Sequence, residues 1–248
     1  MIEKAPVANF LTMMTLDSSY LPLTSSMPEK VATNSHVSPW LATLTYPLGS
    51  YLVLPAYFRH IQVTGQDNIP RTGPVIIAPT HRSRWDALMV PYSTGRLTTG
   101  RDLRFMVTSD EVKGIQGWFI RWLGGFAINQ KQPAISSLRH GVDLLKNQEM
   151  LVIFPEGNIF RDQQVHPLKP GLGRLAIQAE LSHPGLNVKI VPMTIRYQPT
   201  IPQWGSQVQI KIGTALSVNS YCHGSSKQDA KKLTADLTSV LQELDQDD

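Results

Sequence analysis

A short apolar run that ends directly before a cluster of polar and charged residues is the feature that most constrains this chain. The run is Pro74–Pro79, and the polar cluster Thr80–Asp86 follows at once. An apolar run of this length bounded by prolines predicts a buried strand. Helix-forming residues come next, so the sequence predicts a strand-to-helix junction at His81. Ser83 is expected to cap the helix, with Asp86 at its third position.

His81 and Asp86 could form a catalytic pair. Residues five positions apart on one helix point about 140° apart. The two side chains therefore meet only if His81 lies in the loop and Asp86 in the first turn. Such a contact would hold one ring nitrogen and leave the other free as a base, and the helix N-terminus would disfavour a protonated ring. A capping box at Asp86 beside an ordinary loop histidine is the simpler alternative.

A second apolar run, Leu151–Pro155, ends in a turn at Glu156 and Gly157. His-x4-Asp followed by Phe-Pro-Glu-Gly at this separation resembles the glycerolipid acyltransferases of the lysophosphatidic acid acyltransferase type. The resemblance runs from about Gly65 to Thr214. It implies an α/β fold, with a mostly parallel sheet flanked by helices. It also implies transfer of a fatty acyl group to the free hydroxyl of a lysophospholipid, with acyl-CoA or acyl-carrier protein as donor. The leading acceptor is 1-acyl-sn-glycerol 3-phosphate, which would give phosphatidic acid.

The resemblance implies roles for the residues of both blocks. His81 would be the general base, and Asp86 would fix its tautomer and stabilise the developing imidazolium. Glu156 would bind hydroxyls of the acceptor, and Gly157 would let the backbone turn tightly. The alternative for Glu156 is a charge at a helix N-terminus or a structural hydrogen-bond hub. Backbone N–H groups near the helix start are candidates for holding the oxyanion.

The phosphate of the acceptor is expected to contact basic residues close to two positions where the family carries arginines. Gln130 and Ile159 occupy those positions here. The nearest basic residues, with the next candidate last, are Lys131, Arg161 and Lys169. Arg82 and Arg84 are expected either to pair with phosphates of CoA or to be solvated.

Charge and cysteine content limit the partners. The net charge is +4 and the pI is about 9.2, which suits anionic lipid headgroups, phosphorylated substrates or nucleic acid. The resemblance favours a lipid surface over nucleic acid. A single cysteine, Cys222, excludes an intramolecular disulfide and is typical of a reducing compartment. No zinc-type spacing occurs, and the resemblance implies no metal and no cofactor, because the acyl thioester is a co-substrate.

The sequence predicts three parts. Residues 1–38, rich in Ser, Thr, Pro and Met, are expected to be poorly ordered. Residues 39–60 are expected to form an apolar helix on the membrane surface, because residues 31–58 lack Asp, Glu, Lys and Arg and contain Trp and Tyr. A helix packed on the protein core and a true membrane span are the alternatives. Residues 61–248 would be the acyltransferase domain, associated with the cytoplasmic face as a peripheral or monotopic protein.

Further elements follow from apolar periodicity. Strands are expected at residues 61–64, 103–107, 189–195 and 208–212. The last alternates apolar and polar residues, which favours a sheet edge. Helices are expected at residues 112–123, 135–146, 172–181 and 227–244.

Other functions are compatible with the same residues. The acceptor could be another lysolipid, glycerol 3-phosphate or an alcohol without phosphate. A non-enzymatic membrane-associated protein of the same fold is the second alternative. The intact set His81, Asp86, Glu156 and Gly157 argues against it, because a binding module needs no base. The sequence does not decide the acyl-chain length or the acyl donor.

Overall fold

The computed structural model describes residues 39–108, 124–128 and 135–246. Three sequence predictions fall outside these residues: the poorly ordered segment 1–38, the helix at 112–123 and the candidate phosphate ligand Lys131.

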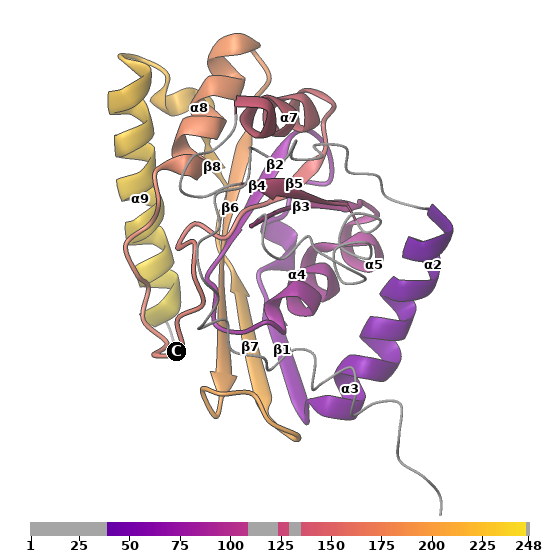
Figure 1. Ribbon diagram of the computed structural model, residues 1–248. Helices are drawn as coiled ribbons and strands as arrows, with labels where there is room; N and C mark the ends of the chain where they lie inside the picture. Colours follow the sequence, from indigo (N-terminus) through magenta and orange to yellow (C-terminus); the bar gives the residue numbers. More distant parts are fainter. Residues whose placement is uncertain (1–38, 109–123, 129–134, 247–248) are drawn as a thin grey trace, which may run out of the picture. The chain divides into compact units, whose positions relative to one another are not determined.

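A single sheet lies at the centre of the described residues (Figure 1). Its strands are β1 (His60–Thr64), β2 (Val75–Pro79), β3 (Leu103–Thr108), β4 (Gly125–Ile128), β5 (Met150–Val152), β6 (Lys189–Gln198), β7 (Gln207–Ile212) and β8 (Leu216–Ser217). The longer helices are α2 (Pro39–Leu48), α4 (Asp86–Thr94), α7 (Ile135–Lys146), α8 (Gly171–Ser182) and α9 (Ser226–Gln246). Short helical segments are η1 (Gly49–Val53), α3 (Leu54–Tyr57), η2 (Gln66–Asn68), α5 (Arg96–Thr99) and η4 (Val218–Tyr221).

The sheet is mostly parallel, as the sequence predicts. The strand order is β1-β7-β6-β2-β5-β3-β4, with β8 paired to β6. All neighbours from β6 to β4 are parallel, whereas β7 runs antiparallel to β6 and parallel to β1. The prediction that residues 208–212 form an edge strand is wrong, because β7 lies between β1 and β6. Its alternation arises because one face packs in the core while the other is only partly covered.

The central strands are buried on both faces, which explains their uninterrupted apolar sequence. In β2, Ile76 and Ala78 pack in a cluster with α7, α8 and α9. Val75 and Ile77 point to the opposite face and pack with residues of α3 and α4. Figure 1 shows these helices on the two sides of the sheet. The buried stripe on α9 follows helical spacing, with Ala230, Leu233, Leu237 and Leu241.

The N-terminal helical segments α2, η1 and α3 follow one another without a break. Leu54 and the following Phe58 are buried against the core. A different side of the segments exposes large apolar side chains, namely Trp40, Leu44, Leu48, Tyr51 and Leu52. Within the described residues, no helix is both long and apolar enough to cross a bilayer. The segment thus packs on the core along one side and presents an apolar stripe along another.

Candidate active site

The pairing of β2 with β5 brings the two sequence blocks together. Ile77 lies opposite Val152 in the parallel register, and the Ile153 N–H donates to the Ile77 carbonyl at 3.1 Å. Both strands therefore end at the same edge of the sheet, where open α/β sheets place their sites. The chain beyond each strand meets the other directly, since the His81 N–H donates to Glu156 Oε2 at 2.7 Å.

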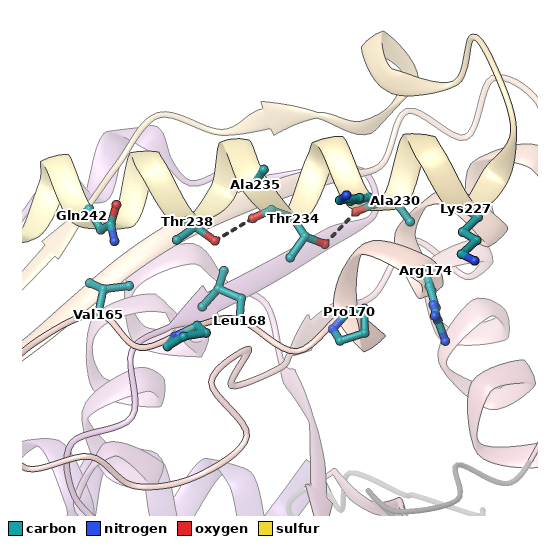
Figure 2. A pocket seen from close by; sticks show the side chains of 12 residues that line it. Val165, Leu168, Pro170, Arg174, Lys227, Ala230, Thr234, Ala235, Thr238 and Gln242 are labelled. Carbon is teal, nitrogen blue, oxygen red and sulfur yellow. Dashed lines mark hydrogen bonds between the residues drawn. The ribbon is translucent and has the colours of Figure 1, made fainter.

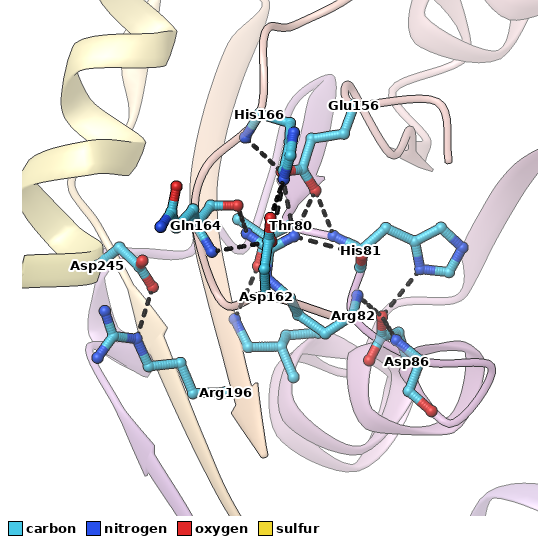
Figure 3. A network of polar contacts seen from close by, with 12 residues as sticks. Thr80, His81, Arg82, Asp86, Glu156, Asp162, Gln164, His166, Arg196 and Asp245 are labelled. Atoms are coloured by element: carbon cyan, nitrogen blue, oxygen red, sulfur yellow. Dashed lines mark hydrogen bonds and ion pairs between the residues drawn. The ribbon is translucent and has the colours of Figure 1, made fainter. Parts of the chain in front are cut away.

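His81 and Asp86 are in contact. His81 Nδ1 lies 2.8 Å from Asp86 Oδ2. An ionised carboxylate can only accept, so in a neutral imidazole this contact places the hydrogen on Nδ1 and leaves the lone pair on Nε2. The Asp86 side chain is fully buried, whereas that of His81 is 18% exposed. In Figure 3 the other edge of the His81 ring points away from the polar network. The arrangement can hold a base with one nitrogen directed outward.

The loop before α4 wraps around the Asp86 carboxylate. Besides His81, Oδ2 accepts the N–H groups of Arg82 at 2.6 Å and Ser83 at 2.9 Å. α4 begins at Asp86 itself, so Asp86 is the first residue of the α-helix and not the expected third. The Ser83 hydroxyl accepts from the Trp85 N–H at 3.3 Å, which is the bond expected of a capping serine. The bond from the Ser83 N–H to Asp86 is the second bond of a capping box. The Asp86 carboxylate therefore organises the start of the helix and at the same time holds the His81 ring.

Tyr197 completes the surroundings of Asp86 and was not predicted. Its hydroxyl donates to Asp86 Oδ1 at 2.6 Å. Burial, followed by the charge and the hydrogen bond of Asp86, raises the pKa of Tyr197 well above its usual value. The phenol therefore stays protonated and keeps donating. Tyr197 lies on β6 beyond the expected end of that strand, so local periodicity gave no signal for it.

Phe154 restricts the His81 ring from a second direction. The two rings stack with centroids 4.1 Å apart and planes inclined by 24°. Phe154 belongs to the Phe-Pro-Glu-Gly block, but sequence reasoning assigned it no role. Phe154 lies two residues after β5, beside the carboxyl end of β2. This position is the signal that could have indicated a contact with His81.

The contacts of Glu156 are those of a structural hydrogen-bond hub, the alternative to binding the acceptor. Its Oε2 accepts from the His81 N–H and from Arg82 Nη1, the latter at 2.8 Å. Its Oε1 accepts from Arg82 Nη1 at 3.0 Å and from the His166 N–H at 2.9 Å. Glu156 is only 1% exposed. Both oxygens thus accept hydrogen bonds from groups of the protein itself (Figure 3).

Arg82 was expected either to bind a phosphate of CoA or to be solvated, and both expectations are wrong. Its side chain is 1% exposed, so it is neither solvated nor open to a phosphate of CoA. Besides Glu156, its Nη2 donates to the Gln164 carbonyl at 2.8 Å. The Arg82–Glu156 ion pair therefore fastens the His81 loop to the segment after β5. Arg84, in contrast, is exposed.

The segment after Glu156 is tied to the His81 loop as well. Gly157 has a φ of 75°, the left-handed conformation expected for its tight turn. The Phe160 N–H donates to the His81 carbonyl at 2.8 Å. Arg161, the next residue, is exposed, and so is Lys169, whose N–H donates to the Pro155 carbonyl at 2.7 Å. Both candidate phosphate ligands are therefore solvent-accessible and close in sequence to anchored backbone.

Asp162 is next to Arg161 in the sequence, but its carboxylate pairs with a different residue. The Asp162 carboxylate pairs with His166 Nε2 at 2.8 Å. The hydrogen bond from His166 lowers the pKa of Asp162. The His166 ring in turn stacks on Phe160, with centroids 3.7 Å apart.

Three of the backbone N–H groups near the helix start, the candidates for holding the oxyanion, are already engaged. The N–H groups of His81, Arg82 and Ser83 donate to the carboxylates of Glu156 and Asp86. They fix the loop that carries the base and are not directed at a substrate.

A groove of about 540 Å³ lies between α9 and the segment that carries Val165 and Leu168 (Figure 2). Its walls are mainly apolar, and Arg174 and Lys227 lie toward one end. Neither His81 nor Asp86 lines it. Across the described ranges, no group of His, Cys, Asp and Glu side chains is arranged to hold a metal ion.

Fold and site define an α/β protein with a His–Asp pair at the carboxyl edge of a mostly parallel sheet. Residues 60–196 match the family described as Acyltransferase, which covers more than half of the chain. The chain belongs to this family.

Individual relatives are more distant. The 1-acyl-sn-glycerol-3-phosphate acyltransferase of Streptococcus pneumoniae is 27% identical over 122 residues, covering 48% of this chain and 40% of that protein. Glycerol-3-phosphate acyltransferase 1, mitochondrial, of Sus scrofa is 27% identical over 194 residues, covering 71% of this chain and 23% of that protein. This chain thus spans less than half the length of these relatives.

The fold also resembles a solved structure. The crystal structure of the 1-acyl-sn-glycerophosphate (LPA) acyltransferase PlsC from Thermotoga maritima superposes with a TM-score of 0.62 at 20% identity. The match covers 84% of this chain and 81% of that one. This likeness supports the α/β architecture derived from the sequence.

Proposed function

We propose that this protein is an O-acyltransferase of glycerolipid biosynthesis. It moves a fatty acyl group from acyl-CoA or acyl-carrier protein to the free hydroxyl of 1-acyl-sn-glycerol 3-phosphate. The observation that carries the proposal is the 2.8 Å contact between His81 Nδ1 and Asp86 Oδ2 at the strand-end edge, with Nε2 left as a base. Family membership supplies the reaction class.

In the proposed reaction, His81 Nε2 takes the proton of the acceptor hydroxyl as its oxygen attacks the thioester carbonyl carbon. A carbon–oxygen bond forms, and the carbonyl becomes an oxyanion. Collapse of this intermediate breaks the carbon–sulfur bond, and the leaving thiolate recovers the proton from the imidazolium. While the ring is protonated, Asp86 stabilises the imidazolium. The stacked ring of Phe154 limits rotation of the His81 ring. A positioned general base contributes roughly 10²–10⁴ in rate.

The experiment is acyl transfer by the full chain, with labelled acyl-CoA and acyl-carrier protein as donors and a panel of lysolipids as acceptors. His81→Ala is expected to abolish turnover while folding persists, because the ring is partly exposed and its loop is held by Glu156. His223→Ala, an exposed histidine on the segment before α9, is the matched control. Turnover of His81→Ala near the wild-type rate would remove the proposed mechanism.

The acceptor is proposed to carry a phosphate. Supporting this, Arg161 is exposed and follows a residue bonded to the His81 backbone. Loss of one charge-assisted phosphate contact costs about 1.5–3 kcal/mol, roughly ten- to a hundredfold in affinity. Arg161→Ala and Lys131→Ala are therefore expected to raise the acceptor KM and to leave the acyl-CoA KM nearly unchanged. If neither does, Lys169 is the next variant to make.

Glycerol 3-phosphate is the second candidate acceptor, because some relatives are named as glycerol-3-phosphate acyltransferases. Assays of both acceptors at equal concentration separate the two. If phosphate-free alcohols react as well as either, the phosphorylated acceptor is the wrong proposal.

The protein is also proposed to work on a membrane surface. The apolar stripe of α2 and η1, which lacks charged residues, supports contact with lipid as a peripheral or monotopic protein. The acceptor, itself a lipid, would be supplied from that surface.

A further inference from the structure

We infer that the loop between β6 and β7 is a second membrane-contacting element, which acts together with the N-terminal helical stripe. Trp204 is 70% exposed and Ile201 is 59% exposed in this loop. From residue 197 to residue 210 the chain has no Asp, Glu, Lys or Arg. The loop thus exposes large apolar side chains to solvent, and its insertion into an apolar environment would not desolvate a charged side chain.

The loop is fixed in place beside the end of α3. The Gly205 N–H donates to the Tyr57 carbonyl at 2.8 Å, and the Arg59 N–H donates to the Ser206 carbonyl at 3.0 Å. The rings of Trp204 and Tyr57 form an edge-on contact with centroids 5.7 Å apart. Tyr57, at the end of α3, therefore joins the helical segments to the loop. Bonds within the loop, such as that from the Gln203 N–H to Ser206 Oγ at 2.8 Å, hold its shape.

A lipid bilayer is the occupant that this surface fits. The helical stripe exposes Trp40 and Tyr51 among its apolar side chains, and the loop exposes Trp204 beside Ile201. The polar edges of Trp and Tyr suit the headgroup level while their rings enter the acyl region. Basic residues lie beyond the two segments, with Arg59 after the helices and Lys211 after the loop, whereas Arg196 before the loop pairs with Asp245 at 2.8 Å. Basic residues at such positions face anionic headgroups favourably.

The loop lies near the candidate active site, so its contact with a membrane would bear on the supply of substrate. The Tyr57 ring that touches Trp204 also packs on Trp85, with centroids 4.4 Å apart. Trp85 directly precedes Asp86, and β6 carries Tyr197, which holds Asp86, just before the loop begins. The loop thus lies at the same edge of the sheet as His81. Docking by this surface would bring the bilayer to the edge where the proposed acceptor is needed.

The inference rests on the proposed membrane role of the helical stripe, and its test separates the two. The full chain is incubated with vesicles of phosphatidylcholine and phosphatidylglycerol, and bound protein is measured by flotation. Burying one large apolar side chain is worth about 1.5–3 kcal/mol, so Trp204→Ala is expected to lower the partition coefficient roughly tenfold or more. Leu181→Ala, an equally simple truncation of an exposed apolar residue on α8, is the matched control and should bind as wild type.

A second measurement does not depend on removing apolar surface. Brominated phosphatidylcholine quenches tryptophans that enter the acyl region. Wild-type emission is expected to be quenched more strongly than that of Trp204→Phe, which keeps an aromatic ring and the fold. Equal quenching of the two proteins overturns the inference.

The other possible results distinguish the membrane role of the loop from that of the N-terminal helices. If Trp40→Ala/Leu44→Ala releases the protein but Trp204→Ala binds as wild type, the loop inference fails and the role of the helices stands. If neither variant loses binding, both fail. If Trp204→Ala instead abolishes a concentration-dependent dimer seen by sedimentation and leaves vesicle binding unchanged, the surface joins two copies of the chain, and the bilayer is the wrong occupant.

Discussion

Replacing Glu156 by glutamine tests whether this residue holds the fold or the substrate. The change keeps the shape of the side chain and removes its charge. Arg82 would then be a buried cation without its counter-ion, and an amide NH₂ would face one of the donors that now meet the carboxylate. Breaking a buried ion pair by removing one partner costs about 3–5 kcal/mol. That is a large share of the roughly 5–15 kcal/mol that stabilises a typical domain.

The assay is urea unfolding of the full chain followed by circular dichroism, alongside steady-state acyl transfer. Glu156→Gln is expected to lose about 3–5 kcal/mol and to lower kcat, because the bond from the His81 N–H to Glu156 helps to place the base. Glu149→Gln is the matched control. That carboxylate also pairs with an arginine, Arg104, but at a partly exposed position, so its loss should cost about 1 kcal/mol or less.

A double-mutant cycle with Arg82→Met isolates the pair. The double variant Arg82→Met/Glu156→Gln removes the stranded cation and should be more stable than Glu156→Gln alone, with a coupling energy of about 2–3 kcal/mol. The reasoning is refuted if Glu156→Gln unfolds as wild type and raises only the acceptor KM. That result would return Glu156 to the role of an acceptor ligand.

Two further changes test the surroundings of the base. Asp86→Asn should cost about 1–3 kcal/mol in urea unfolding, and lower turnover, because an amide nitrogen would face a donor in place of an oxygen. Tyr197→Phe should remove an alkaline loss of stability. Because the pKa of Tyr197 is raised above its unfolded value of 10.0, the native protein keeps a proton there that the unfolded chain loses. Above pH 10 the unfolding free energy of wild type should therefore fall by up to about 1.4 kcal/mol per pH unit more than that of the variant. Parallel pH profiles would exclude this role for Tyr197.

The sequence determined the architecture because strands buried on both faces need uninterrupted apolar residues. The run at residues 75–79 and the helical stripe on α9 are such local signals, and both elements are where periodicity placed them. The ordered pair of motif blocks indicated which strand ends carry the site. For the stretch at residues 39–57, composition showed an apolar segment, but not which side faces the core.

Tertiary structure decided what each polar residue of the site does. The sequence left Arg82 as a solvated or CoA-binding cation, and the family resemblance implied that Glu156 binds the acceptor, with a structural hydrogen-bond hub as the alternative. The ends of the paired strands β2 and β5 instead bury both side chains and join them in an ion pair. Tyr197 reaches Asp86 across 111 positions of sequence, which no local pattern records. The exposed Trp204 is of the same kind, since only the fold sets the β6–β7 loop beside α3. Burial and partner are properties of the packed sheet, because they depend on residues distant in sequence, and they fix whether a charge binds substrate or holds the chain together.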